Sequence, residues 1–341
     1  MEDGETISGK MIFGEKFYKT MEEIRNNKFN LPDAPTSTVL DFEPINYPND
    51  DSFLSRIEGV EKKKLNAENG YELLKKGRII ASYDESIELF SGLEGSANLT
   101  AHCMVLLGKI EYKPSTFVTY YFYTRSERYA KGSEAIKYSS KIEEDIKKDY
   151  AEDRKKFLLR NAPESSILFI DGPLLGGNLN HITREMNKEL VSKNILPVHF
   201  VKNSNSNLVS DNLPTLKGKY NSDLDWAHNE IRMGERSPFF MYIDKHDEEN
   251  GKVFCYLRTS EQTVQRVEFY IQAYQRFKNE IDDVMDLVLY MLYAQGNDKN
   301  PQVRTIAISE KYARAILKFV KVSYLNTFLF TPTMNSIRFN R

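Results

Sequence analysis

The alternation of hydrophobic and polar positions predicts an early group of β-strands. Apolar, β-rich residues occupy Arg78–Tyr83, His102–Tyr112 and Thr116–Thr124, and Lys113–Ser115 separates the last two runs. Runs of this composition on either side of a Pro-containing break are typical of a β-hairpin. We therefore expect three strands, of which the last two form a hairpin.

The spacing of apolar residues then changes from that of a strand to that of a helix. In the charged stretch Ser126–Arg160, Ile142, Ile146 and Tyr150 recur every four residues, which places them on one face of a helix. Ser166–Asp171 is a continuous apolar run, typical of a strand buried on both faces. The last two elements of this region are a helix at Leu175–Lys193 and a second buried strand at Leu196–Val201.

The resulting order of elements, βββαβαβ, is the plan of the RNase H-like fold. We predict an α/β protein with a central mixed sheet flanked by helices, followed by additional strands and helices toward the C-terminus. In such sheets, ligands bind at the carboxyl ends of the strands. Asp84 and Asp171 close the first and fourth strands. These strands lie side by side in this plan, so we expect the two carboxylates to converge on one site.

The rest of the chain predicts no second independent domain, because no long linker or repeat interrupts it. Residues 1–76 form an N-terminal region with a helical stretch near Glu15–Asn26 and an irregular Pro- and Asp-rich passage. Residues 77–341 form the main domain, with a core at 77–203 and a C-terminal part at 204–341. The elements expected in the C-terminal part are helices at Ser222–Met233, Arg276–Gln295 and Thr305–Leu325 and strands at Pro238–Ile243, Val253–Thr259 and Val264–Tyr270.

Composition narrows the class of protein. Lys and Arg number 47 against 49 Asp and Glu, so contact with nucleic acid would require a local basic groove. Cys103 and Cys255 both lie in apolar runs, which indicates a reducing compartment. The first ten residues lack the order of a signal peptide and no apolar run is long enough to span a bilayer, so we expect a cytoplasmic protein with no membrane partner. The chain has no phosphate-binding Gly-Lys-Ser/Thr loop, and its five histidines show no metal-ligand spacing.

Two converging carboxylates, joined by a third acidic residue from the intervening helix, would form an oxygen-only site suited to Mg²⁺ or Mn²⁺. Such a site activates water and clamps the oxygens of a phosphodiester. Asp84 and Asp171 are therefore candidate metal ligands and candidate catalytic residues for phosphodiester hydrolysis. The competing interpretation is that each aspartate only begins a turn, where Asp is common.

These features resemble the NurA family of archaeal DNA-repair nucleases. The fourth strand of that family ends in Asp-Gly-Ser or Asp-Gly-Pro followed by Leu, which Asp171–Leu174 matches. Its first strand ends in Asp-Gly-Ser, where this chain carries Asp84–Ser86. The other similar segments, in the order of the family, are Pro197–Ser206, Gly234–Phe240 and Arg266–Phe269. Together the matching segments cover Arg78–Ala315.

The resemblance also implies a third acidic residue on the long helix. Glu152 is the best match, with Asp153 and Glu144 as alternatives. A solvated face is the competing interpretation for so acidic a helix.

Three basic residues are candidates for contacts with the DNA backbone. Lys202 follows the last core strand, where the family also carries lysine. Arg258 and Arg266 lie on late strands. The competing interpretation is an ordinary surface lysine and solvated or paired arginines.

Departures from the family pattern fall at functional positions. Glu85 replaces the glycine after the first aspartate, which removes the freedom to adopt positive φ, although its carboxylate is also an alternative metal ligand. Near the C-terminus, the family's Tyr-Pro-x-Pro-Leu-x-x-Ala-His is matched by residues 300–308, so Asn300 and Ile308 stand in place of the tyrosine and the histidine. Isoleucine neither binds a metal nor transfers a proton, which leaves the catalytic set incomplete.

The resemblance implies three functions that the sequence leaves open, together with a homodimer and DNA as a partner. The first is a NurA-like protein of DNA end processing and recombinational repair that binds single-stranded DNA and has lost or reduced nuclease activity. The second is an active Mn²⁺-dependent 5′–3′ exonuclease or single-strand endonuclease that works with a HerA-type hexameric helicase. The third is a scaffold that docks this helicase. The departures at Glu85, Asn300 and Ile308 favour the first.

Overall fold

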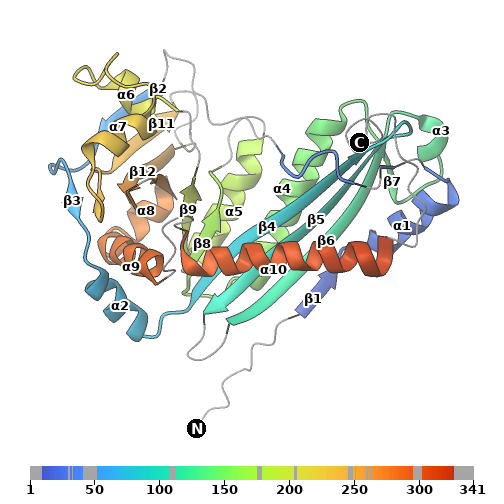
Figure 1. Ribbon diagram of the computed structural model, residues 1–341, viewed down its shortest axis with the longest axis horizontal. Helices are drawn as coiled ribbons and strands as arrows, with labels where there is room; N and C mark the ends of the chain where they lie inside the picture. The colour runs from blue at the N-terminus through green and yellow to red at the C-terminus, as the bar shows by residue number, and fades with distance from the viewer. Residues whose placement is uncertain are drawn as a thin grey trace, which may run out of the picture.

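The strands of the computed structural model belong to one mixed sheet (Figure 1). The description covers residues 10–29, 31–32, 34–40, 52–107, 112–174, 179–202, 206–244, 249, 251–258, 260–261, 263–294 and 302–325. The sheet runs in the order β1-β6-β5-β4-β8-β9-β13-β12-β10-β3. β11 joins it through β12 and carries β2 on its other edge, and β7 lies beside β6.

The centre of the sheet has the RNase H-like order that the sequence predicts. Its strands are β4 (Ile80–Ser91), β5 (Ser96–Leu107), β6 (Tyr112–Thr124), β8 (Ile167–Asp171) and β9 (Leu196–Val201). β4, β5 and β6 pair antiparallel, whereas β8 pairs parallel with both β4 and β9. The first and fourth strands of this core, β4 and β8, are therefore neighbours.

Two details of the early strands differ from the prediction. β4 does not end at Asp84 but continues to Ser91, because β5 pairs with it along its whole length. The predicted antiparallel pairing of β5 with β6 is confirmed, but Lys113–Ser115 lie within β6 and do not separate the two strands. Pro114 is tolerated inside β6 near the start of that strand. Asp84 thus lies within a strand, at the point where the parallel pairing with β8 stops.

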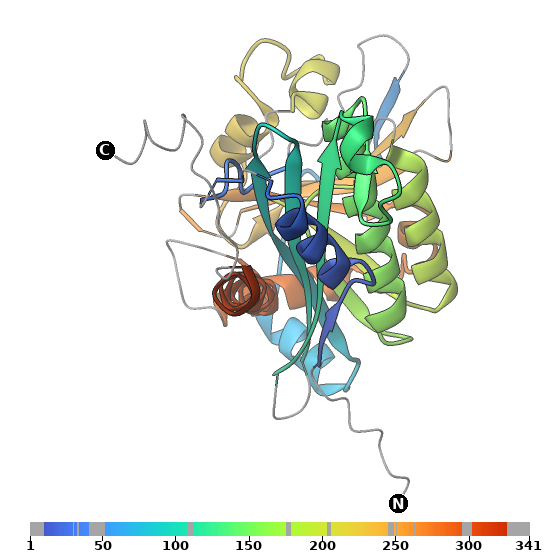
Figure 2. The ribbon, with the colours of Figure 1, turned by 90° about the vertical axis from the view of Figure 1, so that its right-hand side faces the viewer.

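Helices cover both faces of this central sheet (Figure 2). On one face lie α4 (Ile142–Asn161) and α5 (Asn180–Ser192), with Phe157 and Met186 among their buried residues. On the other face lie α1 (Phe17–Asn26) and α10 (Arg304–Val320), which crosses β4, β5 and β6. A π-helical segment, Lys321–Leu325, extends α10.

The sheet continues beyond β9 into the C-terminal part of the chain. The strands of this extension are β10 (Glu235–Arg236), β11 (Phe240–Asp244), β12 (Gly251–Arg258) and β13 (Val264–Tyr270). Its helices are α6 (Leu208–Asn212), α7 (Asp223–Glu230), α8 (Ile271–Arg276) and α9 (Ile281–Tyr293). The remaining short elements near the core are α3 (Glu127–Ala130) and β7 (Ile136–Tyr138). None of the helices in the described part of the chain is long and apolar enough to cross a membrane.

The N-terminal region is built into the same sheet. Its described elements besides α1 are β1 (Lys10–Phe13), β2 (Ser52–Arg56), β3 (Lys63–Lys64) and α2 (Ala67–Lys75). β1 pairs with β6, β2 with β11 and β3 with β10. The expected helical and irregular region therefore also contributes strands to both ends of the sheet.

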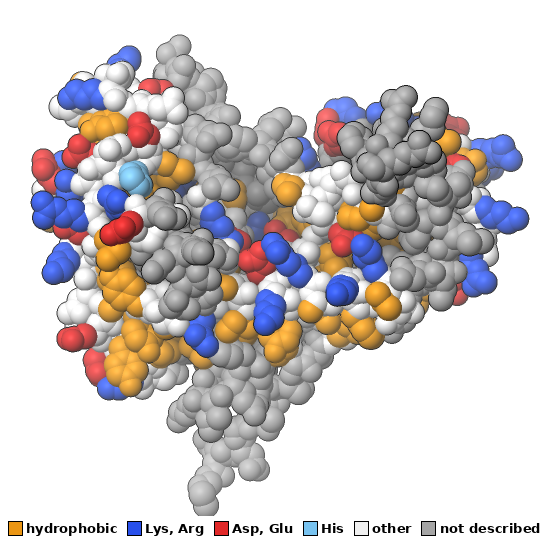
Figure 3. All heavy atoms as spheres, in the orientation of Figure 1, with side chains coloured by type: hydrophobic (Ala, Val, Ile, Leu, Met, Phe, Trp, Pro, Cys, Tyr) orange, Lys and Arg blue, Asp and Glu red, His pale blue; other side chains and the backbone are white. Residues whose placement is uncertain are grey.

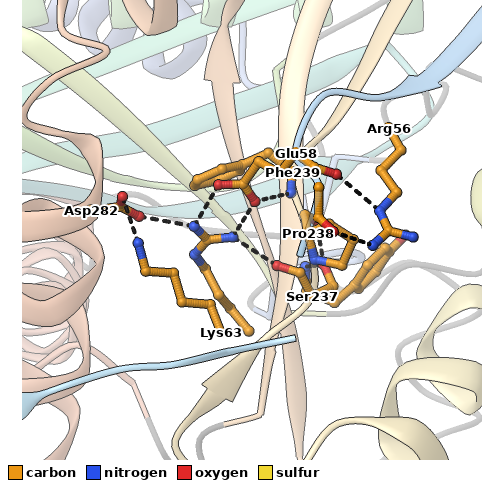
Figure 4. Close-up of polar contacts among 10 residues, drawn as sticks. Arg56, Glu58, Lys63, Ser237, Pro238, Phe239 and Asp282 are labelled. Atoms are coloured by element: carbon orange, nitrogen blue, oxygen red, sulfur yellow. Dashed lines mark hydrogen bonds and ion pairs between the residues drawn. The ribbon is translucent and has the colours of Figure 1, made fainter. Parts of the chain in front are cut away.

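A buried arginine joins this N-terminal region to the C-terminal extension (Figure 4). The Arg236 guanidinium donates to both carboxylate oxygens of Glu58, at 2.7 and 2.9 Å, and to Asp282 Oδ1 at 2.9 Å. The Phe239 ring lies 4.0 Å from the guanidinium. Because β10, α9 and the segment after β2 each supply one partner, this network fixes their relative positions.

Removing Arg236 should destabilise the protein strongly. We expect Arg236→Met to lower the free energy of unfolding by about 3–5 kcal/mol, because Glu58 would remain partly buried without its counter-charge. Urea denaturation measures this change. The exposed Arg232 provides the control, and Arg232→Met should change stability by less than about 0.5 kcal/mol. Equal effects of the two variants would contradict the role of the network.

Candidate functional site

Asp84 and Asp171 come together because β4 and β8 are paired in parallel. The register aligns Tyr83 with Ile170, so the next residue on each strand is one of the two aspartates. Side chains alternate across a strand. Since Ser82 contacts Thr305 of α10, Asp84 also belongs to the face of the sheet that α10 covers. The convergence of the two carboxylates that the sequence predicts is thus built into the sheet.

The Asp84 carboxyl lies in an unusual environment. It is 5% exposed; Oδ1 accepts the Glu85 backbone N–H at 2.8 Å, and the buried Oδ2 has no hydrogen-bond partner. Burial raises the pKa of Asp84 well above its usual range, and the nearby charges of Asp171 and Glu85 raise it further. Asp84 therefore holds an oxygen that receives no hydrogen bond from the described residues.

Asp171 is held at the end of β8 by Lys202. The Lys202 ammonium lies 2.5 Å from Asp171 Oδ2, and the Gly172 N–H donates to Oδ1 at 3.1 Å. Gly172 has a φ of 97°, a conformation that its lack of a side chain permits. Lys202, predicted as a DNA contact, therefore reaches the site and there neutralises one of the two aspartates.

Glu85 faces the opposite side of the sheet from Asp84. Tyr83 packs against the α4 side, and Glu85 follows it two residues later. The Tyr150 hydroxyl of α4 donates to Glu85 Oε1 at 2.6 Å. Burial raises the pKa of Glu85. Its carboxylate is therefore oriented by α4.

The expected third acidic residue does not reach the site. Glu152 is partly exposed and lies 3.6 Å from Lys155. The alternatives are also engaged elsewhere, since Asp153 accepts from the Tyr121 hydroxyl at 2.9 Å and Glu144 pairs with Lys141 at 3.0 Å. Glu152 and Asp153 line a different cavity, between α4 and the β1–β6 edge, because they lie on a different face of α4 from Tyr150. The prediction that an acid of this helix joins Asp84 and Asp171 is wrong in this respect.

Arg154 and Tyr150 are the residues that α4 brings to the site instead. Both line a groove with Glu85 and Asp171, and Arg154 Nη2 lies 3.5 Å from the Asp171 carbonyl oxygen. The sequence contained a signal for this arginine. The four-residue spacing of Ile142, Ile146 and Tyr150 continues to position 154, so a charged residue lies on the inward face of the helix.

The groove above the site has a volume of about 890 Å³ and a basic wall. The overhanging part of β4 and the loop after β8 form its floor, and α10 with its extension forms the wall through Arg314, Lys318 and Lys321. Figure 3 shows basic side chains spaced along α10. Arg314 pairs with Glu310 and Lys321 with Glu88, both ion pairs at the rim. A local basic surface, which the net charge of −2 does not reveal, thus borders Asp171.

Of the remaining predicted site residues, Arg258 and Arg266 do not line the groove, Ile308 packs against Cys103, which pairs with Asp84 across β4 and β5, and Asn300 lies outside the described part of the chain. Arg258 donates to the backbone carbonyls of His228 and Ile231 at 2.6 and 3.1 Å, and thus closes the end of α7. Arg266 is buried and pairs with Glu268 at 2.9 Å. The structure brings neither arginine to the groove, because their donors serve these internal contacts.

A divalent cation fits this site only in part. Asp84 and Asp171 supply oxygen ligands, and the unpartnered Oδ2 of Asp84 is the kind of atom a cation would bind. Among the residues that the structure describes, however, no three Asp, Glu, His or Cys side chains are arranged around one position. The two aspartates therefore suit a Mg²⁺ or Mn²⁺ ion that takes its other ligands from a phosphate and from water.

Comparisons with known proteins identify a family. The model of the NurA domain matches residues 65–315. Curated proteins give no match to the sequence. Among solved structures, endonuclease V of Ciona intestinalis in complex with a 24mer DNA is similar at 12% identity and a TM-score of 0.34, covering 75% of this chain and 95% of that one. The Aa-Ago structure with externally bound siRNA is similar at 11% identity and a TM-score of 0.28, covering 71% of this chain and 28% of that one.

The closeness of the two aspartates has a measurable consequence. We expect Asp171→Asn to lower the pKa of Asp84, because a neighbouring negative charge disappears and Lys202 is freed from its ion pair. Carboxyl-carbon NMR of labelled aspartates, with Asp84→Asn used to assign the signal, measures this value. Asp211→Asn on exposed α6 is the control and should leave it unchanged. An Asp84 pKa that does not respond to Asp171→Asn would show that the carboxylates are not neighbours.

Proposed function

The chain belongs to the NurA domain family, and within this family we propose that it is a DNA-processing protein that binds single-stranded DNA and has lost or reduced nuclease activity. The groove beside Asp84 and Asp171 would hold the strand. Its basic wall would contact the phosphates, since nucleic acids are bound largely through their backbone charge.

One observation carries the preference for binding over cleavage. The helix expected to supply a third carboxylate delivers Arg154 and Tyr150 to the groove. A guanidinium attracts a phosphate but repels a divalent cation. An arginine where a carboxylate is expected therefore favours the binding of DNA and disfavours the binding of a second metal ion. Ile308, which stands in place of the family's histidine, makes apolar packing contacts. This also favours binding over cleavage, because an isoleucine cannot transfer a proton.

The alternative is an active nuclease dependent on Mn²⁺ or Mg²⁺, a 5′–3′ exonuclease or a single-strand endonuclease. It is supported by the buried Asp84 oxygen that lacks a partner beside Asp171. A bound cation would polarise the phosphate and lower the pKa of a water molecule. Asp84 and Asp171 would hold it, while Lys202 would move from Asp171 toward the phosphate.

Partners inferred from the family complete the proposal. A homodimer working with a HerA-type hexameric helicase would place the groove on the path of a DNA strand. In this arrangement, a family member with reduced nuclease activity would guide the DNA strand or dock the helicase.

Incubation of the purified protein with labelled single-stranded DNA separates the two main functions. We expect gel-shift binding that weakens steeply with salt, with a slope that reflects several released counterions. With Mn²⁺ present, we expect little or no cleavage.

The variant Asp171→Asn shows whether any observed cleavage depends on this site. Cleavage by the wild type that this variant abolishes would establish the nuclease and overturn the binding-only function. Absence of salt-sensitive binding would contradict both. The control Lys148→Met removes one exposed positive charge of α4 that does not line the groove, and it should behave as the wild type.

A further inference from the structure

Three arginines are buried in the part of the chain that the structure describes: Arg154, Arg236 and Arg266. Taking a charge out of water costs several kcal/mol unless a partner compensates it. Arg236 has this compensation from Glu58 and Asp282, both of which are labelled in Figure 4. Arg266 has it from Glu268 at 2.9 Å. Buried guanidinium groups in this protein are thus normally paired with carboxylates.

Arg154 does not follow this rule. It is 4% exposed, yet among the described residues no carboxylate oxygen lies within 4.0 Å of its guanidinium nitrogens. Its Nη2 reaches the Asp171 carbonyl only at 3.5 Å, and its buried Nε has no hydrogen-bond partner in the part of the chain that the structure describes. The Tyr83 ring, 5.4 Å away, supports it through a cation–π contact. A group with five N–H donors is therefore held in place with its donors largely unused.

The unused donors lie at the groove. Arg154 lines it together with Tyr150 on the side of α4, opposite the basic wall formed by Arg314 and Lys318. Asp171, the acidic residue beside it, is already paired with Lys202. Glu85 and Asp171 attract the guanidinium without pairing with it, so an anion entering from the groove would supply the close partner that Arg154 lacks. The planar fork of a guanidinium matches two oxygens of a phosphate.

We propose that Arg154 binds a phosphodiester group of single-stranded DNA in this groove, and that this phosphate lies beside Asp171, which lines the same groove. The inference rests on the proposed function and makes it specific. Arg154 sets the position of the strand, whereas the exposed lysines of α10 contribute charge that does not depend on position. A free phosphate or nucleotide carries the same oxygens but lacks the neighbouring phosphates that the basic wall would contact.

The test compares Arg154→Met and Arg154→Lys with the control Lys148→Met. The probe is a short oligodeoxythymidine, and its affinity is measured by fluorescence anisotropy over a range of salt concentrations. We expect Arg154→Met to weaken binding about tenfold to a hundredfold, the range for a lost charge-assisted hydrogen bond. The slope of log K against log salt should fall in size by about 0.7, the value for one phosphate of a single strand. Arg154→Lys should retain the slope but bind more weakly, because it keeps the charge and loses the fork.

A second readout separates ligand binding from a structural role. Without DNA, Arg154→Met should cost much less stability to urea than Arg236→Met, because no described carboxylate lies within 4.0 Å of the Arg154 guanidinium and only its longer-range attraction to Glu85 and Asp171 is lost. A structural arginine would give a clear loss of stability. Arg154→Lys provides the binding measurement if the methionine variant fails to fold.

The outcomes distinguish this inference from the proposed function. If the wild type binds the oligonucleotide and both Arg154 variants bind equally well with the same salt slope, the inference is overturned and the proposed function stands. If the wild type does not bind, both are overturned. Competition by inorganic phosphate or thymidine monophosphate as strong as that by the oligonucleotide would mean that the site takes a free phosphate, which also overturns the inference.

Discussion

The parallel pairing of β4 with β8 is the constraint on which the site depends. It aligns Tyr83 with Ile170 and thereby makes Asp84 and Asp171 neighbours, although 87 positions separate them in the sequence. β4 continues beyond the end of β8, so one side of the overhang is open and becomes the floor of the groove. Two carboxylates placed so closely raise each other's affinity for a positive partner, whether a proton, a lysine or a metal ion. Lys202 already forms an ion pair with Asp171, and Asp84 keeps one carboxylate oxygen without a hydrogen-bond partner among the described residues.

Much of this could be predicted from the sequence. The apolar run that ends at Asp171 and the earlier group of three strands were enough to predict the order of the core, because buried parallel strands and hairpins have distinct periodicities. The same reasoning placed the two aspartates together. Features that depend on tertiary contacts could not be predicted from the sequence pattern. The length of β4 follows from its pairing with β5, and the strands of the N-terminal region are short and pair only with distant partners.

The third acidic position shows most clearly why the rest could not be predicted. α4 is rich in acidic residues, and a resemblance to a family cannot tell which of them faces the sheet. The helical periodicity does identify the residue that faces the sheet, since Ile146, Tyr150 and the position four residues later share one face of α4. That position is Arg154, and its burial contrasts with the exposed or otherwise paired carboxylates around it. The site thus combines two neighbouring aspartates with cations on both walls of the groove, which is the arrangement that led us to propose phosphate binding in preference to a pair of metal ions.

A structure of the protein with a single-stranded oligonucleotide, prepared in the presence of Mn²⁺, tests this account most directly. We expect an intact strand with a phosphodiester oxygen within hydrogen-bond distance of the Arg154 guanidinium, in the groove that Asp171 lines. A cleaved strand whose phosphate is held by metal ions between the two aspartates, with Arg154 turned away from it, would contradict the account.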